Sequence, residues 1–363
     1  MKMKKTILAL LGLSTIFSVM AAEQLPISVT VKLKNNTDVT YKQSELDSIR
    51  YIGGQWGETD AIGVKFYLKG TGMSVDYLFS QMNEYIINDT PEPITNNSNC
   101  NRLSKKYDGS KYMYNLEWPR INETDNNSYS VKSTDDYGVT YSVEWSNTKI
   151  ANRWTCYQMH PGNSLKNVSR QDAFQEDPDL PESTRSTLAD YRSSGFSRGH
   201  LCPSADRLSS QEQNMQTFYL SNMQPQWQSH NAGLWERIES QVRDWNSNYY
   251  RDTLYVVKAA TIANVELNGT TTAGVYTEKC NNRLPVPKYF YCALLSVKNG
   301  KYQAMGIWTT HSDDAQPSTT IKSCAISIDE LERRTGIDFF CNLPDDIEAE
   351  VEASYDETFW GLY

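Results

Sequence analysis

The sequence predicts an α+β protein in which strands outnumber helices, and three observations predict this class. Segments 137–146 and 153–159 alternate polar and apolar residues, as paired strands do. Segments 253–262 and 288–297 are apolar runs of the length expected for buried strands. Segment 231–245 instead repeats its apolar residues at the spacing of an amphipathic helix. The chain has 363 residues, 39% of them hydrophobic, which suffices for two domains with a real core and excludes a wholly disordered protein.

Residues 1–22 have the features of an export signal. A basic start, MKMKK, precedes the apolar stretch TILALLGLSTIFSV, and the small residues Ala21 and Ala22 lie near a cleavage point. We therefore expect an exported protein, either periplasmic or secreted. No later stretch approaches the ~20 apolar residues of a membrane-spanning helix, so we expect no membrane span. Removing the three lysines of this segment leaves 32 basic and 44 acidic residues, and a net charge of −12 argues mildly against nucleic-acid binding.

Residues 23–95 are predicted to form a small β-rich N-terminal module of unknown role. Residues 27–51 alternate in polarity around an Asn- and Asp-rich turn and predict a β-hairpin. Residues 64–70 predict a further strand, and residues 75–86 predict a short helix. The module contains no cluster of catalytic residue types, so we interpret it as a binding or tethering element.

The remaining chain is predicted to be a linker region followed by one large domain. Residues 96–130 are rich in Asn, Ser and Thr and are typical of a linker. Residues 131–363 contain the strand and helix patterns described above. The last twenty residues, 344–363, hold seven acids and no base and predict an acidic surface tail or helix.

Seven cysteines lie beyond the export segment. In an exported protein they predict disulfides, with at least one thiol left unpaired because the count is odd. No CxxC pair occurs, which argues against a thiolate zinc site or a thioredoxin-like redox site. The spacing does not determine the pairing. The seven are Cys100, Cys156, Cys202, Cys280, Cys292, Cys324 and Cys341.

Only four histidines occur, which limits the candidates for a general base. His200 lies in the segment GFSRGHLCPSADR, where neighbouring arginines favour a neutral imidazole. A neutral imidazole can accept a proton from water, so His200 is the strongest candidate. His160 is interpreted as a turn residue. His311, in a polar loop with two Asp, resembles a metal cluster only superficially.

The helix predicted from Asn231 carries an unusual polar stripe. Asn231, Trp235, Glu239 and Arg243 are spaced by four residues, so they follow one slowly drifting line along the helix. Other residues supply the apolar face, so a core does not need this stripe. The alternative is an ordinary amphipathic helix with Asn231 as its N-cap.

Three motifs together carry a family resemblance. SRGHLCPSADR, FYLSNMQPQ and NAGLWERIE, in this order, resemble the DNA/RNA non-specific endonucleases, the family of the Serratia-type nuclease and endonuclease G. The resemblance covers roughly residues 137–310 and does not extend to residues 23–120. It implies a ββα-metal (His-Me finger) domain with a mixed central sheet, and metal-dependent hydrolysis of DNA, RNA or both with little sequence specificity. Whether the chain forms a homodimer stays open.

The resemblance also implies roles for individual residues of the site. His200 would be the general base, and Asn231 the one direct protein ligand of a Mg²⁺ ion that Mn²⁺ could replace. Water would fill most of the metal's coordination shell. Glu239 would hold and orient metal-bound water. Asn222 would help to place the metal site or His200.

Three arginines would face the phosphate by the same resemblance: Arg198, Arg243 and Arg170. Cleavage of a phosphodiester needs an activated water, a Lewis acid and positive charge for the added negative charge, so these residue types suit the reaction. The bond broken would be P–O3′, which leaves 5′-phosphate and 3′-hydroxyl ends.

The chain departs from the family pattern at Ser197, where the usual residue is Asp. We expect Ser197 to affect the conformation of the loop and not the chemistry. We expect Cys202, two residues after His200, to form a disulfide that fixes this loop. Two other functions are alternatives: a catalytically silent nucleic-acid-binding or adhesion protein on the same fold, and an HNH-type site using His230 with Asn231. The second lacks a further His or Asp at ligand spacing downstream.

Overall fold

The structure is a computed structural model that describes most of the chain. The described residues are 19–20, 28–34, 38–42, 45–52, 62–69, 71, 73–88, 96–104, 111–267, 270–272, 275–276 and 280–362. The chain divides into two compact units, Met1–Ile94 and Thr95–Tyr363, each of which has its own core.

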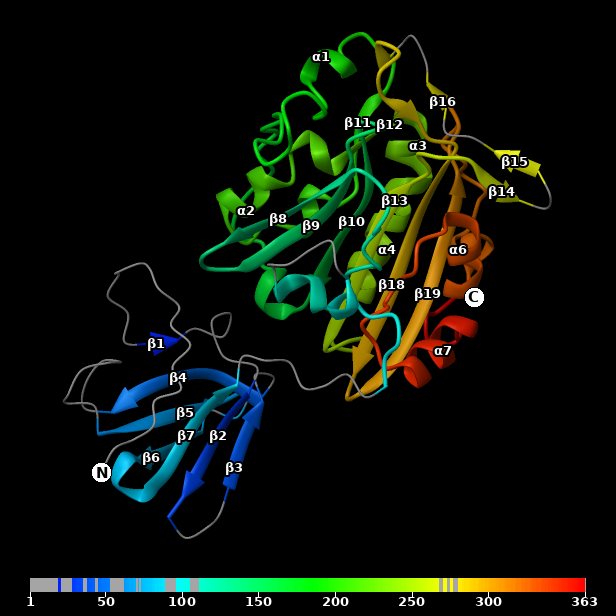
Figure 1. The fold of residues 1–363 in the computed structure, drawn as a ribbon. Helices are drawn as coiled ribbons and strands as arrows, with labels where there is room; N and C mark the ends of the chain where they lie inside the picture. The colour runs from blue at the N-terminus through cyan, green and yellow to red at the C-terminus, as the bar shows by residue number, and fades with distance from the viewer. Residues whose placement is uncertain are drawn as a thin grey trace. The chain divides into compact units, whose positions relative to one another are not determined.

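The first unit contains two small antiparallel sheets. One has the order β3-β2-β7 and the other the order β1-β4-β5-β6 (Figure 1). The predicted hairpin is present, since β2 pairs with β3 and Thr30 lies opposite Thr40. Its inward face, with Val29 and Val31, joins the core of this unit. The strands are β1 Val19–Met20, β2 Ser28–Leu33, β3 Asp38–Lys42, β4 Leu46–Ile52, β5 Gly63–Leu68, β6 Ser74–Leu78 and β7 Met82–Asn88.

The helix predicted over residues 75–86 is wrong. The segment forms β6, a single 3₁₀ turn at Phe79–Gln81, and then β7. Val75 and Tyr77 lie opposite Phe66 and Val64 of β5, so pairing with that strand overrides the local helical spacing. Within the predicted export signal the structure describes only β1, which pairs with β4; the rest of that segment lies outside the described residues.

The second unit is built on one seven-stranded sheet with the order β20-β19-β18-β13-β10-β9-β8 (Figure 1). The sheet was expected to be mixed, but every described pairing in it is antiparallel. The predicted strands at 137–146, 153–159, 253–262 and 288–297 are all confirmed. The strands of this sheet are β8 Asn127–Thr134, β9 Gly138–Ser146, β10 Ala151–Met159, β13 Thr253–Ala260, β18 Tyr289–Lys298, β19 Lys301–Thr310 and β20 Ala325–Ile326.

The predicted linker at 96–130 is wrong as well, because this segment packs into the second unit. Trp118 and Ile121 are buried in a core cluster under the sheet. The side chain of Asn101 donates hydrogen bonds to the carbonyls of Met113 and Pro119, at 3.1 and 3.0 Å. Aromatic residues among the polar ones explain the difference, since their burial fixes a segment that composition alone would leave loose. Short 3₁₀ turns at Asn101–Leu103 and Lys111–Tyr114 lead into β8.

Helices cover both faces of this sheet. Helix α4, Glu236–Trp245, packs against one face, where Leu254 and Val256 of β13 point. Helices α6, Ile328–Thr335, and α7, Asp345–Ala353, pack against the other face, toward which Val257 and Ala259 point. Of the two alternatives expected for the acidic C-terminal segment, a surface tail or a helix, a helix is present, and it contributes to the fold because Glu348 and Glu352 are buried. The shorter elements are α1 Leu188–Tyr191, α2 Gln211–Gln216, α5 Ile321–Cys324, β14 Val265–Leu267, β15 Thr270–Thr272, β16 Val275–Tyr276 and β17 Pro285–Val286.

The predicted disulfides are absent: none of the seven cysteines, all of which the structure describes and buries, forms a disulfide. Cys202 and Cys292 pack among the apolar side chains on the α4 face, and Cys156 packs on the opposite face. They behave as small hydrophobic residues. Among the helices that the structure describes, none has the length and apolar character needed to cross a membrane.

Candidate active site

A short hairpin carries the candidate base. Strand β11, Ser197–His200, pairs antiparallel with β12, Met223–Gln226, so that His200 lies opposite Met223. Gly199 is required here by space, since a Cβ at this position would lie 2.0 Å from the Gln226 Oε1 atom. Glycine at this position therefore allows the two strands to approach each other, while Arg198 and His200 on either side keep the side chains assigned to the site.

A continuous helical segment follows the hairpin. It begins with α3, Gln228–His230, passes through a π-helical turn at Asn231–Trp235 and continues as α4. Asn231 is helical and its N–H donates to the Trp227 carbonyl at 2.8 Å, so it is not the N-cap that was considered. The helix is distorted at Gly233, where φ is −112° and ψ is −109°. Single π-turns of this kind occur frequently at functional sites.

The polar stripe of this helix faces the hairpin. The Trp235 indole N–H donates to the carbonyl of His200 at 3.3 Å. Trp235 is fully buried, so this bond fixes the helix against the strand that carries His200. Glu239 and Arg243 follow on the next two turns of the same stripe.

His200 is enclosed by aromatic rings and positive charge. The ring of Phe174 lies 5.8 Å from the imidazole, and the ring of Phe218 lies 5.1 Å from it in an edge-to-face arrangement. The Arg198 guanidinium stacks on Phe174 at 3.7 Å, and that of Arg170 lies over Phe218 at 4.8 Å. Burial, followed by the charges of Arg170, Arg198 and Lys258, lowers the pKa of His200 to about 3. Its Nε2 atom is buried and has no hydrogen-bond partner among the described residues.

Glu239 and Asn231 carry side-chain oxygens that could bind a metal and that no other described residue contacts by a hydrogen bond or an ion pair. Burial raises the pKa of Glu239 to about 7, and Lys258 and Arg243 oppose this rise while Asp206 adds to it. A half-buried carboxylate and an amide oxygen, neither with a partner among the described residues, are the hard ligands that Mg²⁺ prefers. The residues present therefore fit the divalent metal that the resemblance implies.

Asn222 does not point at a ligand. Its amide makes three hydrogen bonds, all to backbone: it accepts from the N–H of Cys202 at 2.8 Å and donates to the carbonyls of Cys202 and Thr217, both at 2.9 Å. It is fully buried. Asn222 is therefore a positioning residue for the segment that follows His200.

The three predicted phosphate-facing arginines differ in their partners. Arg243 is paired with the buried Asp206 at 3.2 Å, and Arg170 with the exposed Asp172 at 2.7 Å. Arg198 has no carboxylate partner in the described part of the chain, so its charge is the most available of the three. Arg198 and Arg170 both lie at His200, whereas Arg243 lies along α4 near Glu239.

Sequence reasoning missed Lys258. This lysine lies on β13, is fully buried, and its Nζ has no hydrogen-bond partner among the described residues. The Nζ lies 5.9 Å from the ring centroids of both Tyr157 and Trp235. Its charge lowers the pKa of both His200 and Glu239. The available signal was a single lysine inside the apolar run TLYVVKAATI, where a charge needs a reason.

The other histidines have structural roles. His230 is buried, and its Nδ1 lies 2.7 Å from the Gln226 amide nitrogen, so the HNH-type site is not formed. His311 begins the polar loop that was expected, but its side chain is buried; its Nε2 accepts from the Trp227 N–H and its Nδ1 donates to the Pro287 carbonyl, both at 2.7 Å. His160 is the predicted turn residue and caps a 3₁₀ turn.

The fold has a counterpart among solved structures. A chain in the crystal structure of the EndoG/EndoGI complex matches with a TM-score of 0.51 and 24% sequence identity, covering 59% of this chain and 86% of that one. The hairpin with its histidine and the helix that follows it are the parts of a ββα-metal finger. At this identity the likeness shows the fold alone.

Sequence comparison identifies the family. The pattern described as DNA/RNA non-specific endonuclease matches residues 122–346, more than half of the chain, and the protein belongs to this family. A nuclease of Nostoc sp. is 31% identical over 224 residues, which are 60% of this chain and 76% of that protein. Nuclease C1 of Cunninghamella echinulata is 30% identical over 212 residues, 56% and 81% of the two chains. The mitochondrial nuclease EXOG of Danio rerio is 28% identical over 206 residues, 56% and 59% of the two.

Proposed function

We propose that this protein is a metal-dependent endonuclease that cleaves phosphodiester bonds of DNA, RNA or both with little sequence preference. One observation carries the proposal: a buried, neutral His200 whose Nε2 has no partner among the described residues, beside the stacked Arg198 and Arg170. A silent binding protein would have no need to keep an unpartnered imidazole in this position.

His200 is suited to accept a proton from the attacking water. Its lowered pKa keeps the imidazole neutral at neutral pH, so Nε2 can act as acceptor without first losing a proton. The bond from Trp235 to its carbonyl and the contacts of Phe174 and Phe218 hold the ring in one place. Such positioning is itself a large part of catalysis.

Arg198 and Arg170 supply positive charge for the phosphate. Their guanidinium groups lie over aromatic rings beside His200, which orients them. Arg198 has no carboxylate partner among the described residues, and Arg170 uses its Nε on Asp172. Bonds to phosphate oxygens carry no direct information on base sequence, so weak sequence preference follows. Arg243 lies further along the helix, where its bond to Asp206 leaves other donors for a phosphate.

Asn231 would hold the metal directly and Glu239 would hold it through water, with Mg²⁺ as the natural ion and Mn²⁺ as a substitute. When bound, such an ion supplies Lewis-acid stabilisation of the phosphoryl and leaving oxygens. Glu239 orients water with its carboxylate, and Lys258 favours the ionised form of that carboxylate. We further propose that residues 1–22 direct export to the periplasm or beyond.

Digestion of plasmid DNA and of RNA by the purified protein tests the proposal. We expect cleavage of at least one substrate with Mg²⁺ and none after chelation and dialysis. His200→Ala should lower the rate ~10²–10⁴-fold, the usual contribution of a general base. His160→Ala is the matched control and should keep full activity, because His160 caps a 3₁₀ turn and is not one of the residues assigned to the site. A His200→Ala variant that keeps a tenth of the rate contradicts the assignment of the base.

A further inference from the structure

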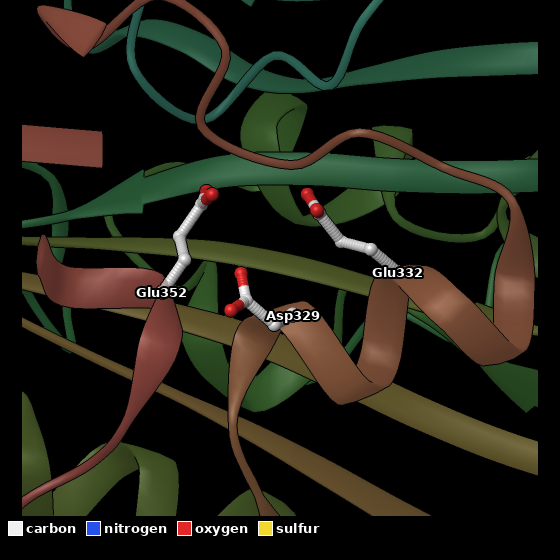
Figure 2. A group of neighbouring side chains, drawn as sticks. All are labelled: Asp329, Glu332 and Glu352. Carbon is white, nitrogen blue, oxygen red and sulfur yellow. The ribbon is translucent and has the colours of Figure 1, made fainter. Parts of the chain in front are cut away.

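Three carboxylates from two helices meet on the sheet face opposite the nuclease site. Asp329 and Glu332 belong to α6, and Glu352 belongs to α7. One carboxylate oxygen from each lies within 4.8 Å of the others. Figure 2 shows all three side chains directed into the space between the two helices. Both helices pack on the core cluster that lies across the sheet from α4.

Glu352 is the unusual member of this cluster. Glu352 is only 5% exposed, and its Oε1 atom is buried without a hydrogen-bond partner among the described residues. An isolated buried carboxylate is costly, and proteins normally pair it or use it to coordinate a metal. Glu352 therefore points a free oxygen toward Glu332 and Asp329 with nothing in the described protein to balance it.

The described cations nearby are used elsewhere. Arg333 and Arg334, on the same helix as Asp329, both pair with Glu330, at 2.7 Å. None of the three clustered carboxylates makes an ion pair in the described part of the chain. Burial, followed by the charges of neighbouring carboxylates, raises the pKa of Glu352 to about 10 and that of Glu332 to about 8. Asp338 and Glu348 add to this negative field.

We propose that Asp329, Glu332 and Glu352 bind a divalent cation of the calcium class. Ca²⁺ binds carboxylate oxygens at ~2.3–2.6 Å. Two ligand oxygens on opposite sides of the ion are therefore up to ~5 Å apart, and the oxygens of this cluster lie within that distance of one another. Mg²⁺ is usually held by only one or two carboxylates and keeps most of its water, so three converging carboxylates favour Ca²⁺. Asp329 is exposed, which leaves a path from solvent and room for water ligands.

The ion would join α6 to α7. The N–H of Phe339 donates to Glu332 at 2.6 Å and holds this side chain in place, so the ligands arise from a fixed helix and not from a loose loop. The site is distinct from the nuclease centre, because the sheet separates it from His200 and α4. Its expected effect is on the stability of the C-terminal helices and not on the cleavage step.

The test uses the full chain after chelation and dialysis, titrated with CaCl₂ while binding heat and the unfolding temperature are recorded. Four proteins are compared: the unaltered chain, Glu352→Gln, the control Glu350→Gln and Asn231→Ala. Glu350 is exposed on the same helix α7, which makes it a matched control for charge. Asn231→Ala removes the direct ligand assigned at the nuclease site, so binding there and binding at the cluster are distinguished.

We expect Ca²⁺ to bind and to raise the unfolding temperature of the unaltered chain, Glu350→Gln and Asn231→Ala. In Glu352→Gln the affinity should fall at least tenfold, while the metal-free protein should be no less stable, because an amide of the same shape replaces a carboxyl oxygen that has no hydrogen-bond partner among the described residues. If Glu352→Gln does not fold, Asp329→Asn at the exposed edge gives the same comparison. Calcium binding that survives loss of Glu352, that disappears with Asn231→Ala, or that is absent from the unaltered chain overturns the proposal.

Discussion

The side-chain amide of Asn222 bonds both backbone groups of Cys202. It accepts from the Cys202 N–H at 2.8 Å and donates to the Cys202 carbonyl at 2.9 Å. Cys202 lies two residues after His200, and Asn222 directly precedes β12, so this pair joins the two strands of the hairpin just beyond the imidazole. The disulfide expected at Cys202 is unnecessary, because an amide performs the same task without oxidation.

Asn222→Ala should destabilise the protein and displace His200. It leaves buried backbone groups of Cys202 without partners, and each such group costs ~1–3 kcal/mol. We expect a lower unfolding temperature and a rate reduced at least tenfold. Cys202→Ala is the matched control, because the Asn222 bonds reach only the backbone of Cys202; it should keep its activity. An Asn222→Ala variant with normal stability and rate would refute the positioning role.

The dependence of activity on pH should come from Glu239 and not from His200. His200, with its pKa near 3, stays neutral throughout the range from pH 5 to 8. Glu239, with its pKa raised to about 7, becomes protonated as the pH falls through that value and loses its hold on metal-bound water. The Mg²⁺ concentration for half-maximal cleavage should therefore rise below pH 7. Excess Mg²⁺ should restore the rate, and an acid limb that no amount of metal shifts would assign it to another group.

Lys258→Met should change the pH dependence while leaving the fold intact. The ammonium is buried without a hydrogen-bond partner among the described residues, so an apolar side chain of similar length should be neutral or stabilising. Loss of its charge raises the pKa of Glu239, so less of this carboxyl is ionised at pH 7. Activity at pH 7 should therefore fall by about tenfold for each unit by which the pKa of Glu239 rises, and should recover at higher pH. Lys288→Met, at an exposed position, should change neither property. A Lys258→Met variant with an unshifted profile would show that this charge does not act on the site.

Ser197→Ala should have a small effect. The Ser197 hydroxyl bonds the side chain of Gln228, so its loss removes about one hydrogen bond, ~0.5–1.5 kcal/mol of local order. We expect less than a tenfold change in rate, and the same from Gln228→Ala. Ser197→Asp should be tolerated, because the Gln228 amide can rotate and donate to a carboxylate. If Ser197→Ala is as inactive as His200→Ala, the hydroxyl takes part in the chemistry.

Periodicity was sufficient to predict the elements whose partners lie close in the chain or whose burial is complete. The hairpin of β2 and β3 and the buried strands β13 and β18 follow from their patterns. The segment 75–86 fits both a helix and a strand, and its pairing with β5 decides between them. Likewise, the aromatic residues that draw 96–130 into the second core give no local period.

Some residues of the candidate site could be predicted from the sequence, and others could not. His200, Asn231 and Glu239 were found from motifs whose residues lie close together in the sequence. Lys258 could not be connected to them, because β13 reaches the site only through the register of the sheet. The disulfide prediction failed since composition gives no distances between thiols. The cluster of Asp329, Glu332 and Glu352 depends on how two helices pack, which no local pattern shows.

The contact between Trp245 and Trp360 determines how much of the chain must be synthesised before the helix of the nuclease site can pack fully. The Trp245 indole N–H donates to the Trp360 carbonyl at 3.0 Å, and the two rings pack edge to face 5.0 Å apart in the core beneath α4. A nascent chain that has reached Tyr355 holds every residue assigned to the nuclease site but lacks the partner that completes the packing of its helix. We expect such a chain to digest nucleic acid poorly, so full activity arises only after residue 360 has been added. A chain truncated after Tyr355 that matched the whole protein in the digestion of DNA and of RNA would contradict this timing.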